Sequence, residues 1–256
     1  MIYIKTAEEI ALMREGGKIL AKTLDELSRA VAPGIKTIEI DKLAEGLVLK
    51  YGAKSSFKGY KPKFYEGEKG YPASVCVSIN EEVVHGIPGE RVLKEGDIVS
   101  MDMGILYKGF FTDAAITAGA GKISSQARKL IDVTKKSLEI GIKEIGQGKH
   151  LGDIGFAIQS YAEQNGFSVV RDLVGHGVGK YIHEDPEIPN YGFRGQGLEF
   201  KKGMTLALEP MVNIGAPDVK ILPDGWTFVS SDKSLVAHFE HTVAVTENGA
   251  EILTKL

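Results

Sequence analysis

The sequence predicts an α+β fold in which helices cover one face of a sheet, and three observations lead to that prediction. Each half of the chain carries apolar residues at helical spacing, followed by short apolar runs typical of strands. Residues 93–102 of the first half align with residues 200–209 of the second, so that Asp102 matches Glu209. The chain has 256 residues, of which 43% are hydrophobic and 25% charged, as in an ordinary globular protein. We therefore expect two similar halves that share one sheet, with the helices on its outer face.

The expected element boundaries follow from local signals. Thr6 and Glu9 form a capping-box pattern at the start of the first helix, and Gly52 is expected to stop the second. In the second half, either Ser124 or Ser125 could cap the third helix. Helices are expected over residues 6–31, 37–51, 124–146 and from before 154 to 165. Strands are expected over residues 74–79, 98–103, 114–117, 169–174, 205–212, 227–230 and 242–246, with loops at 60–70 and 216–226.

Charge and composition exclude several functional classes. The net charge of −3 gives no support for DNA binding. The single cysteine, Cys76, excludes an internal disulfide and a Cys-x-x-Cys zinc module. We find no signal-peptide pattern, and no apolar run approaches the ~20 residues that span a bilayer. The chain is therefore expected to be a single cytoplasmic domain with no membrane contact, with internal halves of roughly 1–120 and 121–256.

Four acidic residues stand where a strand pattern would otherwise carry apolar side chains. Asp102 and Glu209 each end an apolar run, while Asp113 and Glu240 lie in aromatic settings. An ionised carboxylate in a strand core is costly unless it is paired or bound to a metal. The turn signal at 108–109 would bring Asp102 and Asp113 to one level of a hairpin. We therefore predict one shared site on a pseudo-two-fold axis.

The chemistry of these residues points to a metal centre. Four carboxylates in one cleft would repel each other, and two divalent cations would balance their charge. His176 lies between glycines that allow close backbone approach to a ligand, but Tyr181 after Lys180 excludes a P-loop. An oxygen-rich set with a single histidine favours Mn, Fe or Co over Zn, although Zn is not excluded. Two ions ~3.5–4 Å apart can activate one water for the hydrolysis of an amide.

Three segments resemble the type I methionine aminopeptidases of bacteria: residues 78–88, 175–179 and 207–210. The spacing of the acids and His176 agrees with the same family, and the match runs from about residue 5 to the end. The resemblance implies the pita-bread (creatinase/aminopeptidase) fold, with a central curved antiparallel sheet and pseudo-two-fold duplicated halves. It also implies a metal-dependent exopeptidase that removes the initiator methionine from nascent proteins and peptides, with a preference for a small second residue.

The resemblance assigns the metal ligands residue by residue. Asp102 would bind one ion, and Asp113 and Glu240 would bridge both. His176 and Glu209 would bind the second ion.

The resemblance also assigns catalytic and substrate-binding roles. His85 and His183, each followed by a proline at the third position, match two histidines that contact the substrate. His183 would help the metals to stabilise the oxyanion, His85 would assist at the amide nitrogen, and Glu209 would move a proton from water to the leaving amine. Tyr71, Cys76 and Trp226 would surround the methionine side chain, whose thioether suits a polarizable aromatic pocket.

Two departures from the family pattern and two open questions remain. Residues 61–69 look like an insert, and Ile182 stands where the family often has an aromatic residue. The sequence leaves open whether a monovalent cation binds near Asn80. It also leaves open whether several lysines form a solvated loop or a transient ribosome contact; these are Lys54, Lys58, Lys61, Lys63 and Lys69. The chain is expected to be a monomer.

Two other functions compete with this interpretation. An Xaa-Pro peptidase would share the fold, but those enzymes usually have an additional N-terminal domain that this chain is expected to lack. A non-catalytic binding module of the same fold would lack some of the metal ligands, whereas all five are present here.

Overall fold

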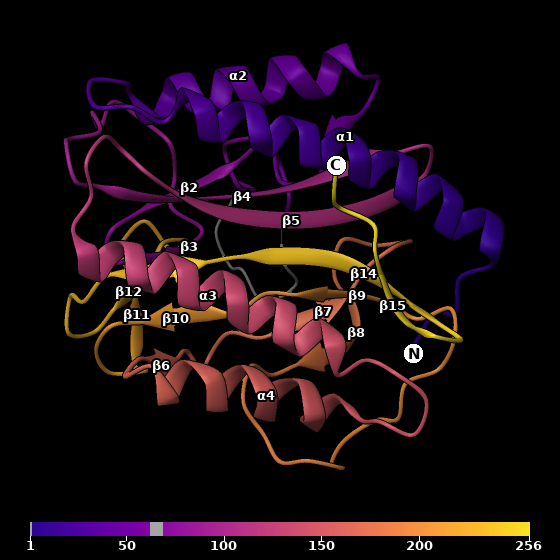
Figure 1. Cartoon of the computed structure of the whole chain (residues 1–256). Helices are drawn as coiled ribbons and strands as arrows, with labels where there is room; N and C mark the ends of the chain where they lie inside the picture. The colour runs from indigo at the N-terminus through magenta and orange to yellow at the C-terminus, as the bar shows by residue number, and fades with distance from the viewer. Residues whose placement is uncertain (1, 62–68) are drawn as a thin grey trace.

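The computed structural model describes residues 2–61 and 69–256, and each half begins with two helices that precede its strands (Figure 1). The first half contains α1 (Ala7–Ala30), α2 (Thr37–Lys50), β1 (Lys54–Ser55), β2 (Cys76–Ile79), β3 (Glu82–Val84), β4 (Ile98–Tyr107) and β5 (Phe110–Gly119). The second begins with α3 (Ser125–Lys143), α4 (Leu151–Gln164), β6 (Ser168–Val169), β7 (Gly175–Gly177) and β8 (Glu184–Ile188). It continues through β9 (Thr205–Leu208), β10 (Met211–Asn213), β11 (Val219–Ile221), β12 (Phe228–Ser230), β13 (Val236–His238), β14 (Glu240–Thr246) and β15 (Gly249–Ile252).

The helices begin where their sequence signals predict. At the start of α1, Thr6 Oγ1 accepts a hydrogen bond from the Glu9 backbone N–H at 3.2 Å, and Glu9 Oε2 accepts one from the Thr6 N–H at 2.9 Å. Ser124, rather than Ser125, caps α3, because its hydroxyl accepts from the Ala127 N–H at 3.1 Å. Helix α2 is followed by Gly52 at a φ of 74°, a backbone conformation that favours glycine.

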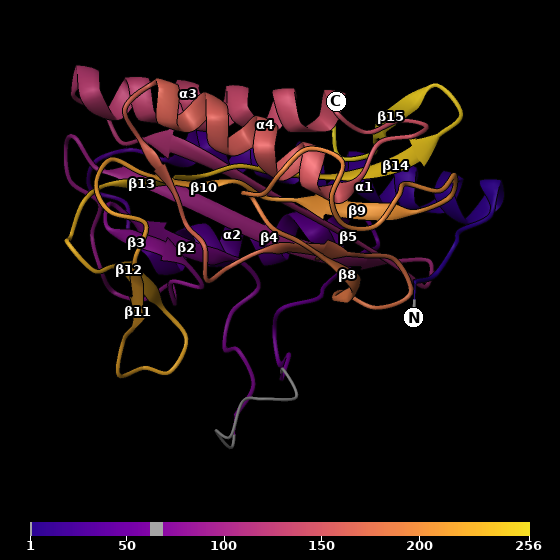
Figure 2. The ribbon, with the colours of Figure 1, turned by 90° about the horizontal axis from the view of Figure 1, so that it is seen from below.

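Within the described residues, nine strands form one sheet whose main order is β1-β4-β5-β14-β9-β7-β8. β2 adds to β4, β15 adds to β14, and all the strand pairs named here are antiparallel. The β5–β14 pair joins strands from the two halves of the chain. Helix α1 lies over β4 and β5, α2 packs beside α1 against β1 and β2, and α3 and α4 lie over the strands of the second half (Figure 1). Figure 2 shows the β11–β12 hairpin projecting on the side away from α3 and α4.

Three sequence expectations about strands and loops need correction. The run 205–212 is split into β9 and β10, because Pro210 has no backbone N–H to continue the ladder, and the two strands lie in different sheets. The expected loop 216–226 contains β11, a short and partly exposed strand that pairs with β12. The expected strand 169–174 is reduced to β6.

Two further sequence expectations concern the loop at residues 60–70 and the membrane. Of the expected loop 60–70, residues 62–68, including Lys63, lie outside the described residues. Over residues 2–61 and 69–256, no helix is long and apolar enough to cross a lipid bilayer.

Candidate active site

The strand register places the predicted acids on one face of the sheet. Asp102 on β4 lies directly opposite Ala115 on β5, and Ala115 lies opposite Glu240 on β14. Opposed residues of antiparallel strands point to the same face, as do alternate residues along one strand. Asp113, two positions before Ala115, therefore shares the face of Asp102 and Glu240.

The strand register also places residues of the second half beside these acids. Thr242, two positions after Glu240, lies opposite Ala207, and Ala207 lies opposite His176. Glu209 follows Ala207 by two positions, just beyond the end of β9. The intervening residues, such as Met101 and Leu208, pack instead into the cores beneath the helices. The site therefore lies on the sheet face away from the helices.

Distances confirm that side chains from both halves meet. Asp113, His176 and Glu240 each offer one ligand atom, and these atoms lie within 4.8 Å of one another. His176 Nε2 lies 3.6 Å from Glu209 Oε1. Among the residues that the structure describes, Asp102 Oδ1 and Glu240 Oε1 are buried without a hydrogen-bond partner. Such orphaned oxygens are costly in a protein interior unless a cation or another donor engages them.

The electrostatics of the acids agree with a shared cation site. Burial raises the pKa of Asp102 from 3.8 to about 7. Burial and the neighbouring Asp102 raise the pKa of Asp113 well above its ordinary value. The pKa values of Glu209 and Glu240 are also raised well above the ordinary value, first by burial and then by the other carboxylates. A cluster that must otherwise take up protons is a fitting donor set for divalent cations.

The two predicted substrate histidines also reach this face. The His183 ring lies 4.5 Å from the His176 ring, centroid to centroid, and its Nδ1 lies 2.7 Å from the Tyr60 hydroxyl. His85 has a φ of 60°, uncommon for a residue with a side chain, and its ring packs against Phe228. Burial, with a smaller contribution from His183, lowers the pKa of His85 to about 4, so its ring is neutral near pH 7.

Tyr71, Cys76 and Trp226, predicted to line a substrate pocket, belong to one buried apolar cluster. Cys76 lies opposite Asp102 in the β2–β4 register, which places this cluster beside the acids. The rings of Tyr71 and Trp226 meet edge to face with centroids 5.3 Å apart. Ile182 belongs to the same cluster, so an aliphatic side chain fills the place where an aromatic was expected.

Sequence reasoning missed three residues at the site, the first of which is Tyr60 beside His183. Phe57 packs in the apolar cluster, and its position three residues before Tyr60 was the only sequence signal. His238 is fully buried, with Nε2 3.6 Å from Glu209 Oε2, and neither ring nitrogen has a hydrogen-bond partner among the described residues. Its signal was its place two positions before Glu240. His241, on the other side of Glu240, faces away and bonds to Thr254 Oγ1 at 2.9 Å.

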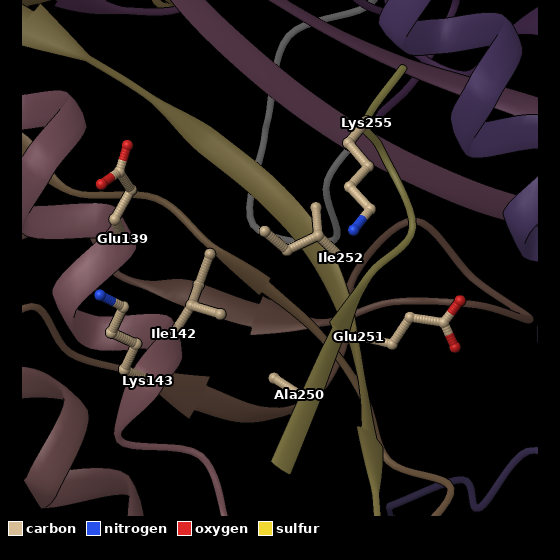
Figure 3. A pocket seen from close by; sticks show the side chains of 7 residues that line it. All are labelled: Glu139, Ile142, Lys143, Ala250, Glu251, Ile252 and Lys255. Carbon is tan, nitrogen blue, oxygen red and sulfur yellow. The ribbon is translucent and has the colours of Figure 1, made fainter. Parts of the chain in front are cut away.

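The surroundings of Asn80 and a hollow beside α3 lie outside this site. The Asn80 side chain donates to Asp97 Oδ1 at 2.9 Å and accepts from the Ile98 N–H at 3.0 Å. A hollow of about 520 Å³ lies between α3 and β15. Figure 3 shows the side chains that line it. Its lining shares no residue with the acid cluster and consists of Glu139, Ile142, Lys143, Ala250, Glu251, Ile252 and Lys255.

Comparison with known proteins places the chain in a family. The model of metallopeptidase family M24 matches residues 11–247. A methionine aminopeptidase of Clostridium perfringens is 52% identical over 254 residues, covering 99% of each chain. Methionine aminopeptidase 1 of Bacillus subtilis is 50% identical over 256 residues, covering all of both chains.

Solved structures agree with this assignment. The methionine aminopeptidase of Thermotoga maritima superposes with a TM-score of 0.95 at 48% identity, with complete coverage of both chains. A prolidase from Pyrococcus furiosus shares the fold, with a TM-score of 0.77 at 23% identity over 99% of this chain and 65% of its own.

The fold and the buried acids thus define a metal-dependent peptidase, and the chain belongs to metallopeptidase family M24. Its high identity over complete chains places it, within that family, among the bacterial methionine aminopeptidases of type I. The resemblance inferred from three short segments, and the pita-bread fold that it implied, are confirmed.

Proposed function

We propose that this protein removes the N-terminal methionine of nascent proteins and peptides, using two divalent ions held by side chains from both halves of the chain. The single observation that carries the proposal is the convergence of Asp113, His176 and Glu240, whose ligand atoms lie within 4.8 Å of one another. Asp102 lies on the same sheet face, and Glu209 Oε1 lies 3.6 Å from His176 Nε2. In our assignment Asp102, Asp113, His176, Glu209 and Glu240 would together hold the two ions.

When bound, the ions would supply charge neutralisation, a more acidic water and a polarised carbonyl oxygen. The oxygen-rich donor set suits Mn, Fe or Co, with Zn as a further choice. Burial of the site contributes by weakening the competition of bulk water for the ions and by strengthening each electrostatic contact.

The chain's own residues would hold the substrate and move its protons. If the Tyr60 hydroxyl donates to Nδ1 of neutral His183, the proton of that imidazole lies on Nε2, which can donate to the oxygen of the scissile carbonyl. Glu209, with a raised pKa, is suited to take a proton from water and deliver it to the leaving amine. His85 would contact the amide nitrogen.

The methionine side chain would enter the apolar cluster of Tyr71, Cys76 and Trp226. Edge-to-face aromatic rings and a buried thiol form a polarizable wall, which suits a thioether better than a charged or strongly polar group. Because the site is buried, a substrate with a small second residue would fit into it more readily than one with a large second residue.

The biological setting follows from the substrate. Newly made chains carry the initiator methionine in the cytoplasm, where we propose that this enzyme acts as a monomer. A transient contact with the ribosome through the lysines around residues 54–69 is part of the same proposal. Salt-dependent co-sedimentation with ribosomes should weaken when Lys54, Lys58 and Lys61 are neutralised.

A substrate comparison tests the proposal directly. With the metal identity controlled, the protein should release free methionine from Met-Gly-Met and leave Ala-Pro-Ala intact. The Met-Lys-Met peptide serves as the control for the second residue and should be cleaved more slowly. Cleavage of Ala-Pro-Ala in preference to Met-Gly-Met would instead identify an Xaa-Pro peptidase. Methionine release that persists in excess chelator would contradict the metal mechanism.

A further inference from the structure

The loop that carries His183 is anchored by a buried ion pair to a residue that precedes α1. The ammonium of Lys5 donates to the carboxylate of Glu184, and the two side chains are only 2% and 1% exposed. Glu184 is the residue directly after His183. A buried pair of this kind leaves an uncompensated charge when one partner is removed, so the surrounding backbone must then move or admit water.

Glu184 also fixes the backbone ahead of His183. Its Oε1 accepts hydrogen bonds from the N–H groups of Lys180 and Tyr181, at 2.6 and 3.0 Å, while Oε2 accepts from Lys5. Hydrogen bonds to an ionised carboxylate are stronger than those between neutral groups. One side chain therefore sets the path of the turn that leads into His183.

Lys5 is itself held on several sides. Its backbone N–H donates to the Gly203 carbonyl at 2.8 Å, and Nζ also donates to the Tyr3 carbonyl at 3.2 Å. Its stem occupies the space next to Gly179, where an added Cβ would lie 2.3 Å from Lys5 Cε. The ammonium thus has little freedom to follow Glu184 if the loop shifts.

We propose that Lys5 and Glu184 are positioning residues that hold His183 in the orientation required for catalysis. The proposal rests on the substrate contact assigned to His183 in the proposed function. His183 has one side-chain hydrogen bond described here, to Tyr60, and that contact restrains the ring but not the backbone that carries it. The position of Nε2 relative to the substrate therefore depends on the turn that Lys5 and Glu184 secure.

Lys5→Met is the first variant, because it removes the charge and keeps most of the apolar stem. We expect kcat to fall by about 10- to 100-fold, as small misplacements of a catalytic group do, with a smaller change in KM and an unchanged content of bound metal. The double variant Lys5→Met/Glu184→Gln removes both charges, while the amide oxygen of the introduced glutamine can still accept the two backbone N–H groups. We expect it to recover part of the lost kcat.

The matched control is Lys180→Met in the same loop. Lys180 pairs with Glu9 at 3.1 Å, but the two side chains are 50% and 22% exposed. An exposed pair contributes little, so kcat should stay within about twofold of the wild type.

The decisive measurement repeats Lys5→Met in a His183→Ala background. Because Lys5 acts through His183, the additional loss of kcat should there be less than about twofold. An equal loss in both backgrounds, or wild-type kcat in the Lys5→Met single variant, would overturn the inference. If Lys5→Met does not fold, the folded double variant takes its place under the same criterion.

The same set of variants separates this inference from the proposed function. Full activity of His183→Ala would refute the role of His183 and, with it, the positioning role. Loss of activity in His183→Ala together with normal activity in Lys5→Met would refute the positioning role alone.

Discussion

Replacing Asp102 by asparagine should stabilise the metal-free protein near pH 8, although it removes a proposed metal ligand. Burial raises the pKa of Asp102 from 3.8 to about 7 in the folded chain. Between these two values the folded state binds a proton that the unfolded state has released. The contribution of Asp102 to the free energy of unfolding therefore falls as the pH rises through this interval, and stays low above about pH 7. Asparagine carries no charge and avoids this loss.

The expected difference in the free energy of unfolding between the wild type and Asp102→Asn follows from the pH range over which it can be measured. At about 1.4 kcal/mol for each tenfold change in proton affinity, the range from pH 5 to pH 7 corresponds to about 3 kcal/mol. Removing the Asp102 charge also relieves its repulsion of Asp113 and Glu209, which acts in the same direction. A domain with a free energy of unfolding of about 5–15 kcal/mol would show this difference clearly.

The assay is urea unfolding of the wild type and Asp102→Asn, in excess chelator, from pH 5 to pH 8. The difference between the two proteins is the measured quantity, because the buried histidines titrate in both and largely cancel. The exposed Asp132→Asn on α3 is the control for the exchange of aspartate for asparagine itself. With saturating Mn²⁺ the order should reverse, because the wild type binds the metal more tightly. A difference that stays constant from pH 5 to pH 8 without metal would refute the reasoning.

Three further predictions concern other parts of the molecule. Asp113→Ala should abolish methionine release and metal uptake together; full activity with two bound ions, by metal analysis, would contradict its assignment as a bridging ligand. Gly17→Ala should cost about 1–3 kcal/mol in urea unfolding, because the added Cβ would lie 2.2 Å from the Leu253 carbonyl oxygen. Gly46→Ala on α2 is its control, since the added Cβ meets nothing within 4 Å and should stabilise slightly. In His238→Gln, the free energy of unfolding should fall less steeply than in the wild type as the pH is lowered. Burial and His85 lower the pKa of His238 from 6.5 to about 3, so the wild type loses stability as the pH falls through that range. Parallel acid limbs for the two proteins would show this to be wrong.

Much of the fold was predictable because its signals are local. Thr6 with Glu9 and Ser124 mark helix starts by hydrogen bonds within one turn, and the structure contains these bonds. The duplicated segments ending in Asp102 and Glu209 predicted a shared site, because a carboxylate at the end of an apolar strand needs a partner. Those signals require no knowledge of distant contacts.

The parts that were missed depend on contacts between distant segments. β11 is only three residues long, lies between Pro217 and Pro223, and is partly exposed, so its short sequence alone does not reveal its pairing with β12. The run 205–212 reads as continuous, but its two parts pair with different strands on either side of Pro210. His238 reaches Glu209 from β13, in a different sheet, and its burial could not be inferred from a neighbouring acid alone. The division into halves at about residue 120 and the roles of individual site residues remain predictions.

The proposed metal ligands and the proposed pocket residues lie on different segments of the fold, so one fold can serve peptidases with different substrates. The acids and His176 lie on β4, β5, β7, β14 and the end of β9, the strands that form the centre of the sheet. The proposed pocket residues come instead from outside these strands: Tyr71 precedes β2, Cys76 begins β2, and Trp226 lies in the turn before β12. A structure named as a prolidase shares the fold at 23% identity, and a shared fold does not by itself determine the substrate. If the methionine side chain enters the proposed pocket of Tyr71, Cys76 and Trp226, exchanging these residues should alter the substrate while leaving metal binding intact.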